Sequence, residues 1–233
     1  MTVLATLKIS ETNLDELATH TGAIAVFATP EGKLDTATST LNLLSNKVIT
    51  RLIESAQFEK LKTGDAIALT FPVGISAAKV IVVKLGRRPS VEDARKAGSS
   101  IAKVRGQDDV LILGGHIGRM EDVAIGVALR SYTFTPHKTG NKDTLGKIEM
   151  MVAAPDDLKA VADVAMAVAQ GVLFTRDLTN EPANVLTTTE FANRLVEFEN
   201  LGMTVEVLEE DALEKLGMGS LLCVGLGSAS PSK

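Results

Sequence analysis

The side chains that most often perform chemistry are scarce and scattered in this sequence. The three histidines, His20, His116 and His137, lie far apart, and no His-x-His or H-E-x-x-H spacing is present. No G-x-S-x-G motif is present for a serine nucleophile. The single cysteine, Cys223, lies in an apolar stretch that predicts a strand, where a neutral, unreactive thiol is expected. Residue types alone therefore indicate no active site.

One glycine-rich loop is a candidate for binding an anion. Gly114, Gly115 and Gly118 follow the apolar run at residues 109–114 and precede a helical pattern. Backbone N–H groups at such a loop could cradle a phosphate, although glycines at strand ends also serve tight turns, and a full G-x-G-x-x-G is absent. The sequence pattern is compatible with either an anion site or a tight turn at this loop.

The charged residues have ordinary structural explanations. Most acidic pairs precede strands or begin helices, where carboxylates oppose the helix dipole. Seven basic residues cluster within one predicted strand–helix unit, which indicates either a solvated face or a contact with a polyanion or another subunit. They are Lys84, Arg87, Arg88, Arg95, Lys96, Lys103 and Arg105.

The elements that would position these groups alternate between strand and helix patterns, which predicts an α/β fold with a mixed sheet flanked by helices. Strands are expected at residues 3–9, 23–28, 66–71, 79–85, 109–114 and 148–153, with a turn at 72–74. Helices are expected at 47–58, 91–105 (with Ser90 in a capping box) and 121–131, and residues 31–40 are expected to form a loop.

The longest predicted helix spans residues 156–178 and divides the chain. Its apolar stripe is Leu158, Val161, Ala165, Val168 and Val172, and further Ala and Val on its other faces predict burial on several sides. Beyond it we expect a turn-rich segment at 179–187, helices at 188–201 and 210–216, and strands at 204–208 and 221–224. The expected domains are therefore residues 1–154, a connecting helix at 155–178, and the incomplete start of a second α/β domain at 179–233.

Composition narrows the class of protein further. The chain has 233 residues, a net charge of −5 and 45% hydrophobic residues. This acidic balance argues against a dedicated nucleic-acid binder. No uninterrupted apolar run reaches the ~18–20 residues of a membrane span, and the first ten residues lack the pattern of a secretory signal. The expectation is a cytoplasmic protein with no membrane partner.

Two segments resemble a known family. Residues 176–187, RDLTNEPANVLT, resemble the R-D-L-x-N-x-P-x-N-x-L-T segment of the leucine aminopeptidase (cytosol aminopeptidase) family. Residues 216–228, LGMGSLLCVGLGS, are similar to that family's L-G-M-x-x-x-L-x-V-G-x-G-S stretch. The region before them is similar to the family's macro-domain-like N-terminal domain, so the resemblance covers the whole chain but only the first part of the family's length.

The resemblance implies a metallo-aminopeptidase that removes N-terminal residues from peptides as a homo-oligomer, a hexamer in the family. In that family two divalent metal ions, Mn or Zn, are held by the motifs G-K-G-x-x-F-D-[ST]-G-G and N-T-D-A-E-G-R, which do not occur here. No catalytic or metal-binding residue is therefore assigned to this chain, and no metal is expected to bind to it. We predict that it is inactive alone and that Asn180, Pro182 and Asn184 form a structural joint.

Two alternative functions belong to other classes of protein. One is a macro-like module that binds a nucleotide or ADP-ribose at Gly114–Gly118, an inference from fold alone. The other is a DNA-binding regulatory role, for which the basic cluster is the only support.

Overall fold

The computed structural model describes residues 2, 4–139 and 145–233. Contacts divide the chain into two compact units, Met1–Leu173 (unit 1) and Phe174–Lys233 (unit 2), and the division falls inside one long helix. The expected start of the first strand at Val3 lies outside the described residues.

Unit 1 contains a six-stranded mixed sheet with the strand order β1-β6-β5-β2-β4-β3. All neighbours are parallel except β3 and β4, which form an antiparallel pair at one edge. The strands are β1 (Leu7–Glu11), β2 (Ala23–Ala28), β3 (Ala66–Thr70), β4 (Lys79–Lys84), β5 (Val110–Gly115) and β6 (Ile148–Val152). The predicted α/β fold with a mixed sheet flanked by helices is confirmed.

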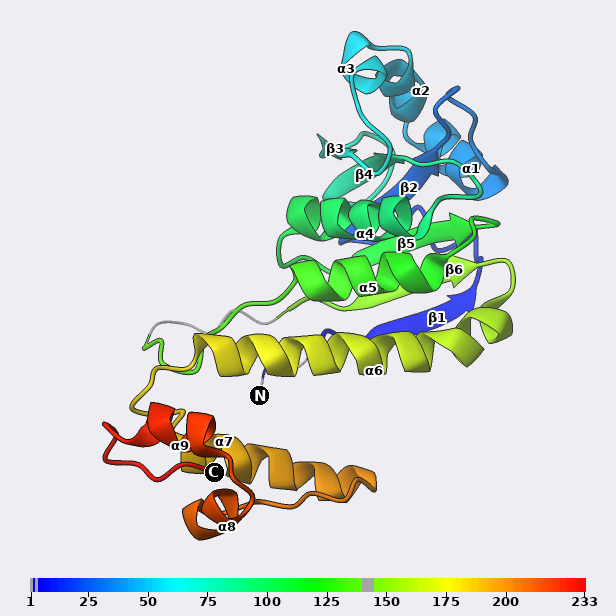
Figure 1. Cartoon of the computed structure of the whole chain (residues 1–233). Coiled ribbons are helices and arrows are strands. Elements are labelled where there is room, and N and C mark those ends of the chain that lie inside the picture. Colours follow the sequence, from blue (N-terminus) through cyan, green and yellow to red (C-terminus); the bar gives the residue numbers. More distant parts are fainter. Residues whose placement is uncertain (1, 3, 140–144) are drawn as a thin grey trace. The chain divides into compact units, whose positions relative to one another are not determined.

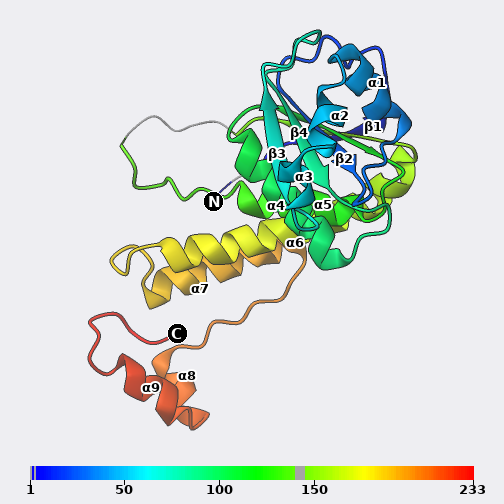
Figure 2. The same ribbon diagram turned by 90° about the horizontal axis from the view of Figure 1, so that it is seen from above.

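Helices cover both faces of this sheet, as Figures 1 and 2 show. The helices of unit 1 are α1 (Thr36–Leu44), α2 (Val48–Ile53), α3 (Ala56–Glu59), α4 (Val91–Arg105), α5 (Met120–Arg130) and the first part of α6 (Pro155–Asn180). One core lies between the sheet and α4, α5 and α6, and includes Phe27, Ile112 and Ile101. The other lies between the opposite face and α1–α3. Because both faces are buried, β2 and β5 consist of continuous apolar residues rather than alternating ones.

The N-termini of the helices follow local capping rules. Ser90 precedes α4, and its hydroxyl accepts a hydrogen bond from the Asp93 N–H at 3.1 Å, as the capping box predicts. Helix α1 corrects the prediction of a loop at residues 31–40. Asp35 caps it through the Thr38 N–H at 2.8 Å, and burial of Ala37 and Leu41 outweighs the poor helix propensity of its threonines. The helix expected at 47–58 is two short helices, because Ser55 begins α3 as a new N-cap.

The long helix α6 packs through a different stripe from the one predicted. Leu158 and Ala165 are buried as expected, but Val161, Val168 and Val172 are exposed. The buried stripe is completed by Ala162, Ala169 and Leu173, since small alanines let the helix approach its neighbours closely. The expected burial on several sides is therefore wrong.

Helix α6 is also the one described helix that is long and apolar enough to cross a membrane by length and composition alone. A third of its most apolar window, 33%, is buried, and core helices of soluble proteins meet the same criterion. This is weak support for a membrane span, and the absence of a membrane partner stays a prediction.

The regular secondary structure of unit 2 consists of helices only, which corrects two predictions. It contains the end of α6, α7 (Thr188–Val196), the short 3₁₀ helix η1 (Glu197–Leu201), α8 (Glu210–Lys215) and α9 (Gly219–Gly225). Residues 204–208 have no regular structure, and residues 221–224 belong to α9 instead of a strand. A strand needs a neighbouring strand to accept and donate its backbone hydrogen bonds, and the described residues of unit 2 contain no such neighbour. Residues 221–224 therefore form the local hydrogen bonds of a helix.

Candidate functional site

The glycine-rich loop lies at the carboxyl end of β5, beside the start of α1. Gly115 has a φ of +51°, in the left-handed region that favours glycine. A Cβ at this position would overlap Oδ2 of Asp35 and lie 3.4 Å from its Cγ. Glycine is therefore needed because the carboxylate that caps α1 approaches the loop closely.

Two amides of this loop already have partners. The Ile117 N–H donates to the Gly114 carbonyl at 2.9 Å, and the Gly118 N–H donates to the Arg87 carbonyl at 3.0 Å. These bonds are those of a closed turn and leave fewer donors for a phosphate.

A small cavity adjoins the loop where β2, β4 and β5 end, the edge at which α/β sheets often bind ligands. Lys33, Arg87 and His116 line it together with Asp35, and its volume is about 30 Å³. Drug-sized ligands usually occupy cavities about ten times larger or more. An anion site at Gly114, Gly115 and Gly118 consequently stays a prediction, and the adjacent Asp35 carboxylate weighs against it.

The segment predicted to form a joint follows the last turn of α6. The Asn180 side-chain amide donates to the Arg176 carbonyl at 2.9 Å, and the Pro182 carbonyl accepts from the N–H groups of Val185 and Leu186, both at 2.9 Å. Asn184 is exposed. These contacts hold the chain in a compact turn between α6 and α7.

Arg194 on α7 forms ion pairs with one residue of this turn and with one residue of its own helix. Nε of Arg194 lies 2.9 Å from Glu190, and Nη2 lies 3.5 Å from Glu181, which is within the turn. The hydrogen bond to Glu190 and the charge of Glu181 raise the pKa of the Arg194 guanidinium above its ordinary value. These ion pairs are not among the features predicted from the sequence, although the spacing of four residues between Glu190 and Arg194 is a signal that indicates the first of them.

The histidines and the cysteine are not brought together. His116 and His137 are exposed, and Nε2 of His20 is buried without a hydrogen-bond partner in the described part of the chain. The predicted strand at Cys223 is wrong, because this cysteine lies on α9, where it is exposed. Across residues 2, 4–139 and 145–233, no group of three or more His, Cys, Asp or Glu side chains could hold a metal ion. These residues do not fit a two-metal site.

The basic cluster is divided among several structural contacts. Lys84 donates to the carbonyls of Phe58, Glu59 and Leu61. Arg95 pairs with Asp122 and Lys96 with Asp65.

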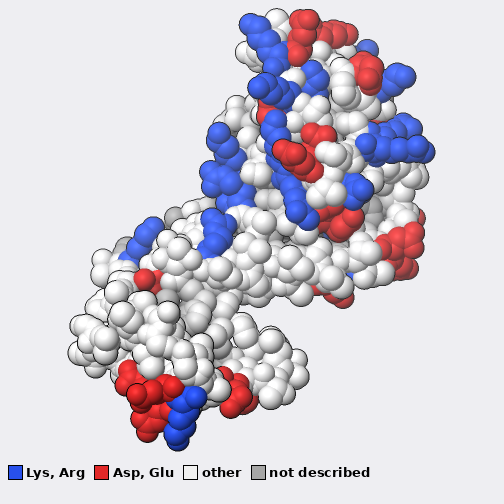
Figure 3. All heavy atoms as spheres, viewed as in Figure 1, with Lys and Arg blue, Asp and Glu red and all other residues white. Residues whose placement is uncertain are grey.

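Arg105, a further member of the cluster, is 1% exposed. Figure 3 shows Asp and Glu side chains interspersed among the Lys and Arg side chains on the face of unit 1 that carries α4. This arrangement favours a solvated, internally paired surface over a face that binds polyanions.

Unit 2 exposes an unusual amount of apolar surface for its size. Its buried hydrophobic residues are Phe174, Ala192 and Leu213. Its exposed large hydrophobic residues are Phe191, Leu201, Met203, Val207, Leu216, Met218, Leu221, Val224 and Leu226. Exposed apolar surface of this extent is typical of an interface with another part of a protein.

The fold and these contacts define an α/β sheet domain followed by a small helical unit. Models of the cytosol aminopeptidase family match both parts: that of the N-terminal domain matches residues 24–141 and that of the catalytic domain matches residues 173–233. The chain therefore belongs to the cytosol aminopeptidase family.

The names of similar proteins support the assignment to this family. A "Probable cytosol aminopeptidase" of Dinoroseobacter shibae is 47% identical over all 233 residues, and one of Cereibacter sphaeroides is 46% identical over the same length. The chain spans 48% of each of these relatives, about half of their length.

Solved structures show the same fold. The bottromycin maturation enzyme BotP has a TM-score of 0.68 at 23% identity, covering 91% of this chain and 44% of that one. A structure of BotP in complex with Mn has a TM-score of 0.67 with the same identity and coverage.

Proposed function

We propose that this chain acts as the N-terminal portion of a cytoplasmic leucyl aminopeptidase, which removes N-terminal amino acids from peptides. The observation that supports this most strongly is the 47% identity to a cytosol aminopeptidase along the whole chain, combined with matches to both family domains. In this proposal residues 1–154 form the N-terminal domain, 155–178 the connecting helix, and 179–233 the start of the catalytic domain.

Within that enzyme the chain would serve structure and oligomerisation. Unit 1 contains a hydrophobic core on each face of its sheet, while exposed apolar side chains lie on unit 2 and along α6. Such surfaces suit contacts with further catalytic-domain structure or with other subunits of a hexamer. Asn180, Pro182 and Asn184 would act as a joint that sets the direction of the chain after α6.

The two divalent metal ions, Mn or Zn, would belong to the complete enzyme. A BotP structure contains Mn, but the described residues of this chain provide no cluster of metal-ligating side chains. We therefore expect this chain alone to bind no catalytic metal and to hydrolyse no peptide.

The test is an aminopeptidase assay on the purified, mass-verified chain. Leucine p-nitroanilide is incubated with the chain in Mn or Zn, with the full-length D. shibae relative as a positive control. The expected result is release of p-nitroaniline by the control alone. Release by the 233-residue chain that EDTA abolishes would overturn the proposal of an inactive portion.

The two alternative functions have their own tests. Calorimetry with ADP-ribose tests the nucleotide-binding module, and absence of heat at millimolar ligand would remove it. A gel shift with duplex DNA at two salt concentrations tests the regulatory role, because true phosphate contacts must weaken as salt rises.

A further inference from the structure

A groove runs along the open edge of the sheet in unit 1. β3 is the outermost strand, and among the described residues only β4 pairs with it. The groove lies between the second half of β3 and the start of α2 and has a volume of about 420 Å³. Its lining comprises Ser45, Asn46, Val48, Arg51 and residues 68–73.

The register of β3 shows which of its backbone groups remain available. The Phe71 N–H donates to the Ala78 carbonyl at 2.8 Å. Leu69, two residues earlier, lies opposite Val80, so its backbone groups also face β4. In an antiparallel pair alternate residues bond to the partner strand, so Ala68 and Thr70 direct their N–H and C=O groups to the open edge. Both residues line the groove, which therefore presents an unused template for one more strand.

Apolar side chains surround this template. Phe71 is 82% exposed and Val73 is 72% exposed, while Leu69 is half-buried. Phe71 also has a φ of +48°, a left-handed conformation that costs a bulky residue about 1–3 kcal/mol. The exposed aromatic ring and the strained backbone are both features of binding surfaces rather than of solvated turns.

The charge that lines the groove is positive. Among the described residues that line the groove, Arg51 is the only charged one and none is acidic. Lys47 lies one turn earlier, at the N-cap of α2, and is exposed. A bound segment with carboxylate groups would therefore meet positive charge without a competing acid.

We propose that this groove binds an extended, acidic peptide segment that adds to β3 as a further strand. The main chain of the peptide would pair with Ala68 and Thr70, and its apolar side chains would cover Leu69 and Phe71. A carboxylate of the peptide would lie against Arg51. Backbone pairing would supply the affinity, and the pockets and the arginine would supply the preference for acidic sequences.

The test uses the complete chain and a fluorescein-labelled peptide of roughly nine residues, the length of an ordinary strand, with alternating valine and glutamate. Fluorescence anisotropy measures binding. One comparison peptide has lysine in place of glutamate, and another is N-methylated at alternate residues, which blocks strand pairing without changing its side chains. We expect the acidic peptide to bind, and we expect each comparison peptide to bind at least roughly tenfold more weakly than the acidic one.

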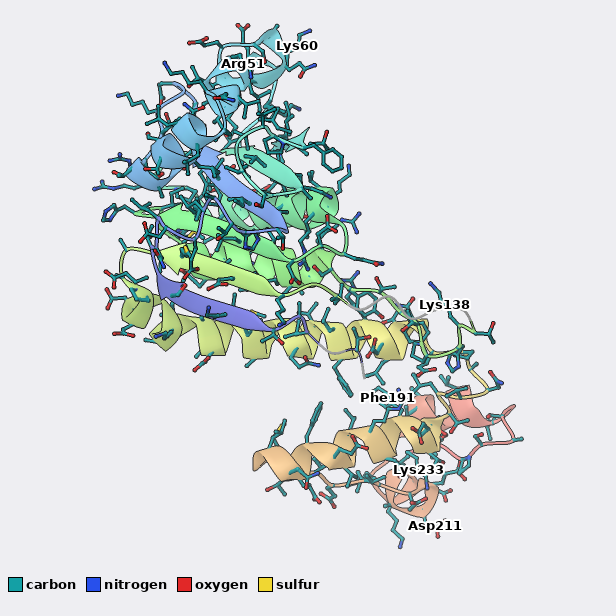
Figure 4. The ribbon with its side chains drawn as sticks, turned by 180° about the vertical axis from the view of Figure 1, so that it is seen from behind. Arg51, Lys60, Lys138, Phe191, Asp211 and Lys233 are labelled. Carbon is teal, nitrogen blue, oxygen red and sulfur yellow. The ribbon has the colours of Figure 1, made fainter. Side chains whose placement is uncertain are left out.

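Two variants of the chain locate the binding. R51E should weaken binding of the acidic peptide about tenfold, whereas the matched control K60E should change it less than about twofold. Figure 4 shows Arg51 and Lys60 at the same end of unit 1. Thr70→Pro removes a donor from the open edge but not from the β3–β4 ladder, so it should abolish binding while the far-ultraviolet circular dichroism stays unchanged.

Three results would overturn the proposal. The first is no anisotropy change up to about 1 mM chain. The second is binding that R51E and Thr70→Pro leave unaltered. The third is a dimer in analytical ultracentrifugation that Thr70→Pro dissociates, because the open edge would then belong to a second copy of the chain.

Discussion

The contact between α4 and α5 allows a stringent test of packing in unit 1. Gly98 of α4 faces α5 so closely that a Cβ would overlap the Val123 carbonyl oxygen and lie 2.8 Å from the Val127 nitrogen. A Cβ added to Gly126 of α5 would likewise overlap the Arg95 carbonyl oxygen of α4 and lie 2.9 Å from the Arg95 carbonyl carbon. Because the atoms in the way are backbone atoms of a helix, Gly98→Ala must push the two helices apart.

The expected magnitude is the difference between two opposing effects. Overpacking costs about 1–3 kcal/mol, and the upper end applies here because neither backbone can rotate away. Alanine regains about 1 kcal/mol of helix propensity. The net loss in the free energy of unfolding is therefore about 2 kcal/mol, and a slope of about 2 kcal/mol per molar urea makes this a fall of about 1 M in the midpoint.

The assay is urea denaturation followed by tyrosine fluorescence. Tyr132 is the only tyrosine and the chain lacks tryptophan, so the signal reports on unit 1. Gly171→Ala is the matched control, because this glycine lies in α6 with nothing within 4 Å of the added Cβ. That variant should gain up to about 1 kcal/mol. If Gly98→Ala is as stable as the wild type or more so, the close approach of the two helices is refuted.

Three further predictions concern the buried Arg105, the N-cap Ser90 and the half-buried carboxylate of Asp65. Arg105→Met removes bonds from the guanidinium to the Asp108 and Gly146 carbonyls and should cost about 3 kcal/mol by urea denaturation, whereas a loss below about 1 kcal/mol would contradict it. Ser90→Ala removes the N-cap of α4 and should cost about 1 kcal/mol in the same assay; an unchanged midpoint would count against the cap. Burial raises the pKa of Asp65, but the Lys62 amide and Lys96 outweigh it, so the net pKa lies below its usual value. The stabilisation from Asp65 is therefore fully present above about pH 4 and is lost as the pH falls through the lowered pKa, so Asp65→Asn should be less stable than wild type at pH 7, with a difference that shrinks as the pH falls below about 4.

Features that depend on local pattern were predictable from the amino-acid sequence. The run at residues 23–28 predicted β2 with its observed bounds, because a strand buried on both faces is apolar at every position. Ser90 and Asp93 predicted the start of α4, because the cap is a bond between near neighbours. The two motifs at 176–187 and 216–228 indicated the family, which the comparisons confirm.

Features that depend on distant neighbours were not predictable in this way. Residues 221–224 have the composition of a strand but form α9, because no strand is present beside them in unit 2. Valine and alanine occur on several faces of α6, so the sequence did not determine which face is buried. Packing against the sheet placed the alanines inward. The approach of Asp35 to Gly115, the close approach of α4 and α5 at Gly98 and Gly126, and the groove beside β3 each involve segments that are separated in the chain. Their geometry therefore depends on how the sheet and helices assemble.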